Sequence, residues 1–119
     1  MRALGRCLPA LAWAGLIFWL SAQPNLPDLP FLFPGADKLI HAGFYGVLAL
    51  LVLAALRPRA RLVWLPIVVA SLYGATDEWH QRYVPGRTAD VLDWSADTAG
   101  AALAVGVWAR RTRRDGKST

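Results

Sequence analysis

Residues 39–56 read LIHAGFYGVLALLVLAAL, and this stretch decides the fold class that the sequence predicts. His41 is its only residue that can carry a charge near neutral pH. A bilayer core of about 30 Å is crossed by roughly 20 mostly apolar residues, because a helix rises about 1.5 Å per residue. The stretch therefore predicts a membrane-spanning helix with one polar group placed inside it.

Three further apolar segments accompany this stretch. The first is uncharged from Cys7 to Pro27, and the last, Val91–Ala109, carries two aspartates. Leu62–Thr76 is uncharged but too short to span a bilayer, so its helix must continue to about Gln81. Because the connections are short, we expect an all-α fold, a four-helix transmembrane bundle in a single domain of residues 1–119. The helices are expected at about residues 7–22, 38–56, 62–81 and 91–109.

The composition agrees with this class. Of the 119 residues, 55% are hydrophobic and six are tryptophan, which is high for a soluble chain of this size. The single cysteine, Cys7, excludes an intramolecular disulfide framework and a cysteine-based zinc site. The composition thus favours a membrane protein.

Ten of the thirteen basic residues gather on one side of the predicted bundle, and Lys38, Arg82 and Arg87 lie on the other. The ten precede the first helix, lie between the second and third, and fill the C-terminal sequence RRTRRDGKST. Because positive residues stay on the cytoplasmic side, we expect the N- and C-termini to be cytoplasmic in a multi-pass protein of the plasma (inner) membrane. The tail is interpreted as an anchor that faces membrane lipid, and no nucleic-acid partner is expected.

The N-terminus also has features of a signal peptide, with a basic start and an apolar stretch. A cut after Ala22 would place the bulky Leu20 where a small residue is required. We therefore expect the first helix to be retained.

The polar residues of the last three segments are predicted to converge at the outer end of the bundle. Asp37 and His41 are four residues apart, as are Asp93 and Asp97, so each pair lies on one helix face. An ionisable group within a membrane helix is costly unless it faces the bundle interior or water, so these faces should point at one another. The predicted binding residues are Asp37, Lys38, His41, Asp77, Glu78, Gln81, Arg87, Asp93 and Asp97.

Several polar residues have an ordinary structural alternative. Asp37 suits a helix N-cap, and Asp90 with Asp93 suits a cap and its partner three residues later. Lys38 can extend to the membrane interface, and His80 can belong to an interfacial belt of aromatic residues.

Other polar residues lack such an alternative. Asp77 and Glu78 fall in the last turn of the third helix, where the helix dipole disfavours negative charge. Asp97 lies about 9–10 Å along the axis from the start of the fourth helix, at about 1.5 Å per residue, and needs a partner there. The partners available to it are Arg87, Lys38 and His41.

Small residues recur at four-residue spacing in two helices. Ala42 and Gly46 lie in the second, and Ala96, Gly100 and Ala104 lie in the fourth. Such faces allow two backbones to approach closely, and core packing alone would also explain them. In either case, tight packing is expected to bring the polar groups within reach of one another.

Three stretches carry a family resemblance: FWLSAQP, DKLIHAGFYGVLAL and TDEWHQRYVPGRTADVLDWSADTAGAALAVG. They resemble the VanZ-like family of integral membrane proteins over nearly everything from Trp19 to Gly106. The predicted binding residues coincide with the pattern of this family. The pattern consists of Asp-Lys-x-x-His, Asp-Glu-x-x-Gln, Pro-Gly-Arg-Thr and Asp-x-x-x-Asn/Asp-Thr-x-Gly. Many relatives have asparagine where this chain has Asp97. The resemblance implies a cell-envelope function, and the founding member is associated with resistance to the glycopeptide teicoplanin.

Three functions are open at this point. The first is binding or modulation of an envelope component, such as a lipid-linked saccharide, an anionic headgroup or a glycopeptide, with an effect on teicoplanin-type susceptibility. The second is a membrane-embedded enzyme that acts on a lipid-linked or phosphorylated substrate, with His41, Asp77 or Glu78 as general acid or base. The third is a buried ion-pair network that fixes helix register without any ligand. We rank them in this order.

The acidic residues outnumber the basic ones at the outer end, which indicates protonated carboxylates or a bound cation. A divalent-cation site of carboxylates with His41 is therefore one alternative, although the chain has no His-Glu-x-x-His or comparable ligand motif. The sequence leaves the oligomeric state open.

Overall fold

The described part of the chain is all-helical. The computed structural model describes residues 2–22, 36–85 and 91–117, and no β-strand occurs among them. The helices are α1 (Arg2–Ser21), α2 (Ala36–Leu56), α3 (Leu65–Gln81) and α4 (Val91–Lys117), with a short 3-10 helix η2 at Ala60–Leu62. The predicted all-α class with four helices is confirmed.

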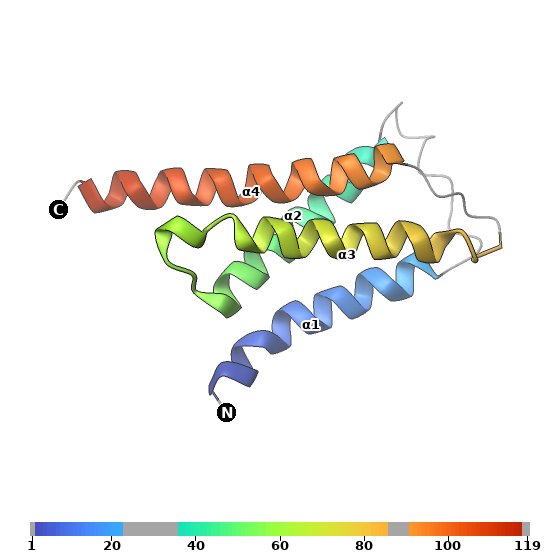
Figure 1. Cartoon of the computed structure of the whole chain (residues 1–119), viewed down its shortest axis with the longest axis horizontal. Helices are drawn as coiled ribbons and strands as arrows, with labels where there is room; N and C mark the ends of the chain where they lie inside the picture. Colours follow the sequence, from blue (N-terminus) through green and yellow to red (C-terminus); the bar gives the residue numbers. More distant parts are fainter. Residues whose placement is uncertain (1, 23–35, 86–90, 118–119) are drawn as a thin grey trace.

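Successive helices run in opposite directions along the bundle (Figure 1). Both chain ends and the connection between α2 and α3 lie at one end. At the other end α1 and α3 finish, and α2 and α4 begin. Helix α2 packs against α1, α3 and α4, and its contact with α4 is the most extensive in the bundle. The closest pair of helices is therefore a parallel pair that is not consecutive in the sequence.

Local sequence explains the connection between α2 and α3. Helix α2 ends at Leu56 because Arg57 adopts a left-handed conformation with φ of 46° and is followed by a proline. Helix α3 begins at Leu65, later than the predicted residue 62, because Ala60–Leu62 forms a separate 3-10 turn. Pro66 occupies the first turn of α3, where its missing N–H costs no helical hydrogen bond.

The first and last helices are longer than predicted. Helix α1 begins at Arg2 and carries Pro9 within it, and α4 continues past Ala109 to Lys117. Four of the eight residues in this extension are arginine, which forms helix readily, and positive charge is favourable near a helix C-terminus.

Small residues bring α2 and α4 together. A Cβ atom added at Gly100 would collide with the backbone of Ala42. A Cβ atom added at Gly46 would lie 3.2 Å from the carbonyl oxygen of Gly100 and 3.4 Å from Cβ of Ala104. The close backbone approach predicted from the small-residue spacing is thus confirmed, and it joins these two helices.

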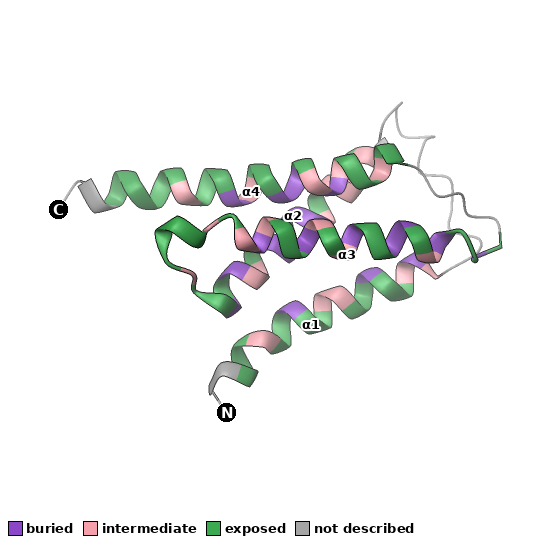
Figure 2. Cartoon of the chain, in the orientation of Figure 1, coloured by how far each residue is buried: buried purple, intermediate pink, exposed green. Residues whose placement is uncertain are grey.

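Polar and apolar residues are distributed in an unusual way. The facing sides of the helices are buried and the outer sides are exposed (Figure 2). Leu72 and Leu103 are 63% and 70% exposed, whereas Asp77 and Asp97 are buried. Water-soluble bundles have the opposite arrangement, with leucine inside and carboxylates outside. The apolar core that does form consists of Ile17, Tyr45, Leu48, Ala49, Ala70, Ala101 and Val105.

Two of the helices are long and apolar enough to cross a membrane. They are α1 over Leu4–Ser21 and α2 over Lys38–Leu56. A signal sequence or the core helix of a soluble protein can have the same length and composition. Helix α3 has 17 residues, and α4 carries charges at both ends.

The close approach of α2 and α4 predicts opposite effects for two glycine substitutions in the same helix. Gly100→Ala should lower the free energy of unfolding in detergent micelles by about 1–3 kcal/mol, because the added methyl group must displace the backbone of Ala42. Gly106→Ala meets nothing within 4 Å and should cost no stability, with a gain of up to about 1 kcal/mol from helix propensity. Equal effects of the two substitutions on thermal or denaturant unfolding would contradict this packing.

Candidate functional site

Two side-chain pairs connect α2 and α4 at the end of the bundle opposite the chain termini. Lys38 Nζ lies 2.5 Å from Asp93 Oδ1, and His41 Nδ1 lies 2.8 Å from Asp97 Oδ1. Lys38 and Asp93 occupy the first turns of their helices, and His41 and Asp97 lie about one turn deeper. The parallel register of α2 and α4 therefore aligns two bases with two acids.

Asp97 is the most deeply buried charged residue of this group, with 0% exposure. Its Oδ1 contacts His41, whereas its Oδ2 is buried and has no hydrogen-bond partner among the described residues. A Cβ atom added at Gly74 of α3 would lie 3.0 Å from this Oδ2. The absence of a side chain at Gly74 thus lets α3 pack directly against the carboxylate.

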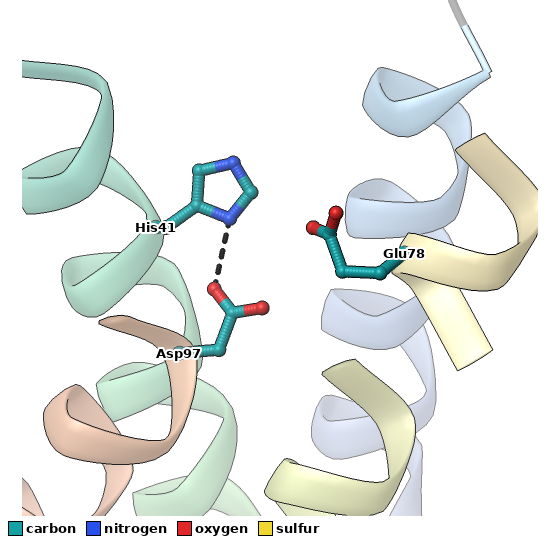
Figure 3. A group of neighbouring side chains, drawn as sticks. All are labelled: His41, Glu78 and Asp97. Carbon is teal, nitrogen blue, oxygen red and sulfur yellow. Dashed lines mark hydrogen bonds and ion pairs between the residues drawn. The ribbon is translucent and has the colours of Figure 1, made fainter. Parts of the chain in front are cut away.

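Glu78 brings a second carboxylate from α3 toward this pair. It is 8% exposed, and its carboxylate points toward the space beside His41 and Asp97 (Figure 3). One ring nitrogen of His41 and one carboxylate oxygen each of Glu78 and Asp97 lie within 4.8 Å of one another. We call these three residues the acid–histidine cluster.

A tyrosine hydroxyl holds the neighbouring acid. Tyr45 Oη donates a hydrogen bond of 3.2 Å to Asp77 Oδ2, and both residues are buried. Tyr45 was not among the predicted site residues, and it lies within the apolar stretch of residues 39–56. It lies four residues after His41, on the same face of α2, and that spacing was the available signal.

Helix α1 also contributes to this end of the bundle. Gln81 Nε2 donates a hydrogen bond of 3.1 Å to Ser21 Oγ, and both residues are buried. Ser21 was not predicted as a site residue, although it lies in the stretch FWLSAQP that carried part of the resemblance. All four helices therefore supply polar side chains here.

Most predicted site residues meet in this region. Asp37 begins α2, but its side chain and the whole of Arg87 and Asp90 lie outside the described residues. His80 stacks against Phe18 with ring centroids 4.8 Å apart, away from the acid–histidine cluster. The residues that the structure brings together are Lys38, His41, Asp77, Glu78, Gln81, Asp93 and Asp97.

The chemistry of the region is acidic and rich in hydrogen-bond acceptors. Its described residues include the four carboxylates of Asp77, Glu78, Asp93 and Asp97 and one lysine, Lys38, which is paired with Asp93. Such a site favours ligands that donate hydrogen bonds or carry positive charge. His41 adds a titratable group, and when Nδ1 donates to Asp97, Nε2 is the proton acceptor.

The fold and the site define a helical-bundle protein with a buried polar cluster at one end. The family model described as VanZ/LLP1 matches residues 7–112. The chain belongs to this VanZ-like family, as its motifs indicated, and family membership together with the apolar helices α1 and α2 indicates a membrane protein. Searches of curated proteins and of solved structures gave no match.

The contact between His41 and Asp97 predicts that substitutions at the two positions are not additive. Either alanine substitution removes the same hydrogen bond, and His41→Ala leaves Asp97 buried without its partner. A double-mutant cycle of His41→Ala and Asp97→Ala in reversible unfolding should give a coupling free energy of about 0.5–3 kcal/mol. The cycle of His41→Ala with Thr112→Ala, at the far end of α4, should be additive. Additivity in both cycles would show that the contact is not formed.

Proposed function

We propose that the chain is a multi-pass protein of the plasma (inner) membrane, in which all four helices cross the bilayer. The main support is the inverted arrangement of carboxylates inside and leucines outside, which suits lipid as the surrounding solvent. It also accounts for α3 and α4, whose charged residues at the polar end are buried against neighbouring helices while Leu72 and Leu103 face outward.

The orientation proposed for this bundle has both termini in the cytoplasm. The exposed arginines of the α2–α3 connection and of the last turns of α4 lie at the same end as the chain termini. Because basic residues are retained on the cytoplasmic side, this end faces inward and the acid–histidine cluster faces the outer leaflet. In this orientation the cluster lies at the envelope side of the bundle.

The proposed function is binding or modulation of an envelope component at the acid–histidine cluster. One observation carries the proposal: Asp97 Oδ2 is buried and has no hydrogen-bond partner among the described residues. A network selected only to fix helix register would satisfy its buried polar atoms, since an unsatisfied one costs about 1–3 kcal/mol. A ligand that donates to this carboxylate would remove that cost.

The acceptor-rich chemistry favours a lipid-linked saccharide as the ligand. Sugar hydroxyl groups donate hydrogen bonds to carboxylates and to histidine, and a lipid tail would keep the saccharide at the outer leaflet. A glycopeptide ligand is a second source of the same hydroxyl chemistry. Altered susceptibility to teicoplanin-type glycopeptides would then follow from the effect of this binding on the envelope.

A second candidate function is a membrane-embedded enzyme for a lipid-linked or phosphorylated envelope substrate. The observation that favours it is the 2.8 Å contact between His41 Nδ1 and Asp97 Oδ1. A carboxylate at Nδ1 fixes the imidazole ring and makes Nε2 the proton acceptor, as general acid–base catalysis requires. A carboxylate oxygen of Glu78 lies within 4.8 Å of the pair, a distance that one water molecule can bridge for proton transfer, and Asp77 accepts a hydrogen bond from Tyr45.

The site proposal predicts the outcome of complementation in a deletion strain with an envelope-antibiotic phenotype. Glu78→Gln and His41→Ala should each reduce complementation to the level of the empty vector, because each removes a group of the cluster. Asp115→Asn, an exposed acid near the other end of α4, should complement fully.

Full complementation by both cluster variants, at equal protein levels in the membrane, would refute both site functions. If complementation is lost, turnover of lipid-linked precursors by purified protein separates the enzyme from the binder.

The proposed orientation predicts the activity of reporters that fold only outside the cytoplasm. A fusion after Thr119 should be inactive, and the same reporter after Pro85, at the end of the turn that follows α3, should be active. Activity of the Thr119 fusion would place the C-terminus outside and contradict the orientation.

A further inference from the structure

We propose that His41, Glu78 and Asp97 bind one divalent transition-metal ion, with Zn²⁺ or Mn²⁺ preferred over Mg²⁺ and Ca²⁺. The inference deepens the proposed function and rests on it, because it assigns a cation to the same outer-facing cluster.

The three side chains offer a suitable set of ligand atoms at suitable separations. Each contributes one nitrogen or oxygen, and these atoms lie within 4.8 Å of one another. Ligands bound to a common metal at about 2.0–2.2 Å are about 3–3.5 Å apart, so a separation at the 4.8 Å limit must shorten by roughly 1.5 Å. Glu78 reaches in from α3 on a flexible side chain, while His41 and Asp97 come from the closely packed α2 and α4 (Figure 3).

A second observation points to a ligand at the same place. Asp97 has 0% exposure, and its Oδ2 has no hydrogen-bond partner among residues 2–22, 36–85 and 91–117. Figure 3 shows this oxygen on the side of Asp97 that faces Glu78. A metal ion between the two carboxylates would coordinate an atom that the described protein does not satisfy.

Neighbouring contacts distinguish these three residues from the other acids. Asp77 accepts a hydrogen bond from Tyr45, and Asp93 is paired with Lys38. Glu78 and Asp97 are the carboxylates whose oxygen atoms lie within 4.8 Å of a ring nitrogen of His41. A cation at this position would also lower the cost of keeping the Asp97 carboxylate at 0% exposure.

The ligand types indicate which ions fit. An imidazole nitrogen suits Zn²⁺ and other transition metals, whereas Mg²⁺ and Ca²⁺ are bound almost entirely by oxygen. Carboxylates suit Mn²⁺ as well as Zn²⁺. Three protein ligands also leave a coordination position open, as in catalytic zinc sites. An oxygen of a phosphate or hydroxyl group could occupy that position, which would allow an acidic site to hold an anionic headgroup.

Equilibrium metal binding tests the inference on the full chain in lipid nanodiscs. The protein carries a tag without histidine and Cys7→Ser to remove the one thiol, and it is stripped with chelator before titration. We expect one Zn²⁺ or Mn²⁺ per chain by calorimetry and elemental analysis, with weaker binding of Mg²⁺ and Ca²⁺. Glu78→Gln, Asp97→Asn and His41→Ala should each weaken binding about tenfold or more.

Matched variants keep this experiment decisive. His80→Ala removes the other histidine and should leave the affinity unchanged, because His80 stacks on Phe18 outside the cluster. Asp97→Asn can still accept a hydrogen bond from His41, so it tests metal binding without breaking the helix contact. Stoichiometric binding that survives all three cluster substitutions, binding lost with His80→Ala, or no stoichiometric binding would each overturn the inference.

The ion site and the proposed function can fail separately. If no metal binds while Glu78→Gln still abolishes complementation, the ion site is wrong and the proposed function stands. If metal binding depends on the cluster while its variants complement fully, the ion site stands and the proposed function is wrong.

Discussion

The contact between His41 and Asp97 is the constraint on which the rest of the structure depends. A carboxylate at 0% exposure between packed helices needs a polar partner, and His41 supplies it at 2.8 Å. That contact requires α2 and α4 to approach closely, which the small residues at Ala42 and Gly100 allow. Gly74 lets α3 come near the same carboxylate, so Glu78 meets the pair from the third side.

Much of this arrangement could be predicted from the sequence because each feature follows from local spacing. Apolar segments predicted the four helices, and four-residue spacing placed His41 and Asp97 on inward faces. Asp77 and Glu78 do lie in the last turn of α3, against the helix dipole, as predicted. The motifs also resembled the VanZ-like family, and the match over residues 7–112 confirms that family.

The rest could not be predicted because it depends on how distant helices align. The sequence offered Arg87, Lys38 and His41 as partners for Asp97, and only the register of α2 against α4 selects His41. The two helices with the most extensive contact, α2 and α4, are not consecutive in the sequence. The short connections therefore did not predict that they pack together. Tyr45 was not predicted as a site residue, because its role depends on α3, which places Asp77 Oδ2 3.2 Å from its hydroxyl.

The central claim, that α2 and α4 bury a histidine–aspartate pair between them, can be measured in a lipid bilayer. Magic-angle-spinning NMR on the His80→Asn variant, with ¹⁵N-histidine and ¹³C-aspartate labels, reports the distance from the single histidine to the nearest carboxyl carbon. A hydrogen-bonded pair places Nδ1 about 4 Å or less from the carboxyl carbon of Asp97, and Asp97→Asn identifies that signal by removing it. A separation beyond about 6 Å in a fully helical protein would contradict the account.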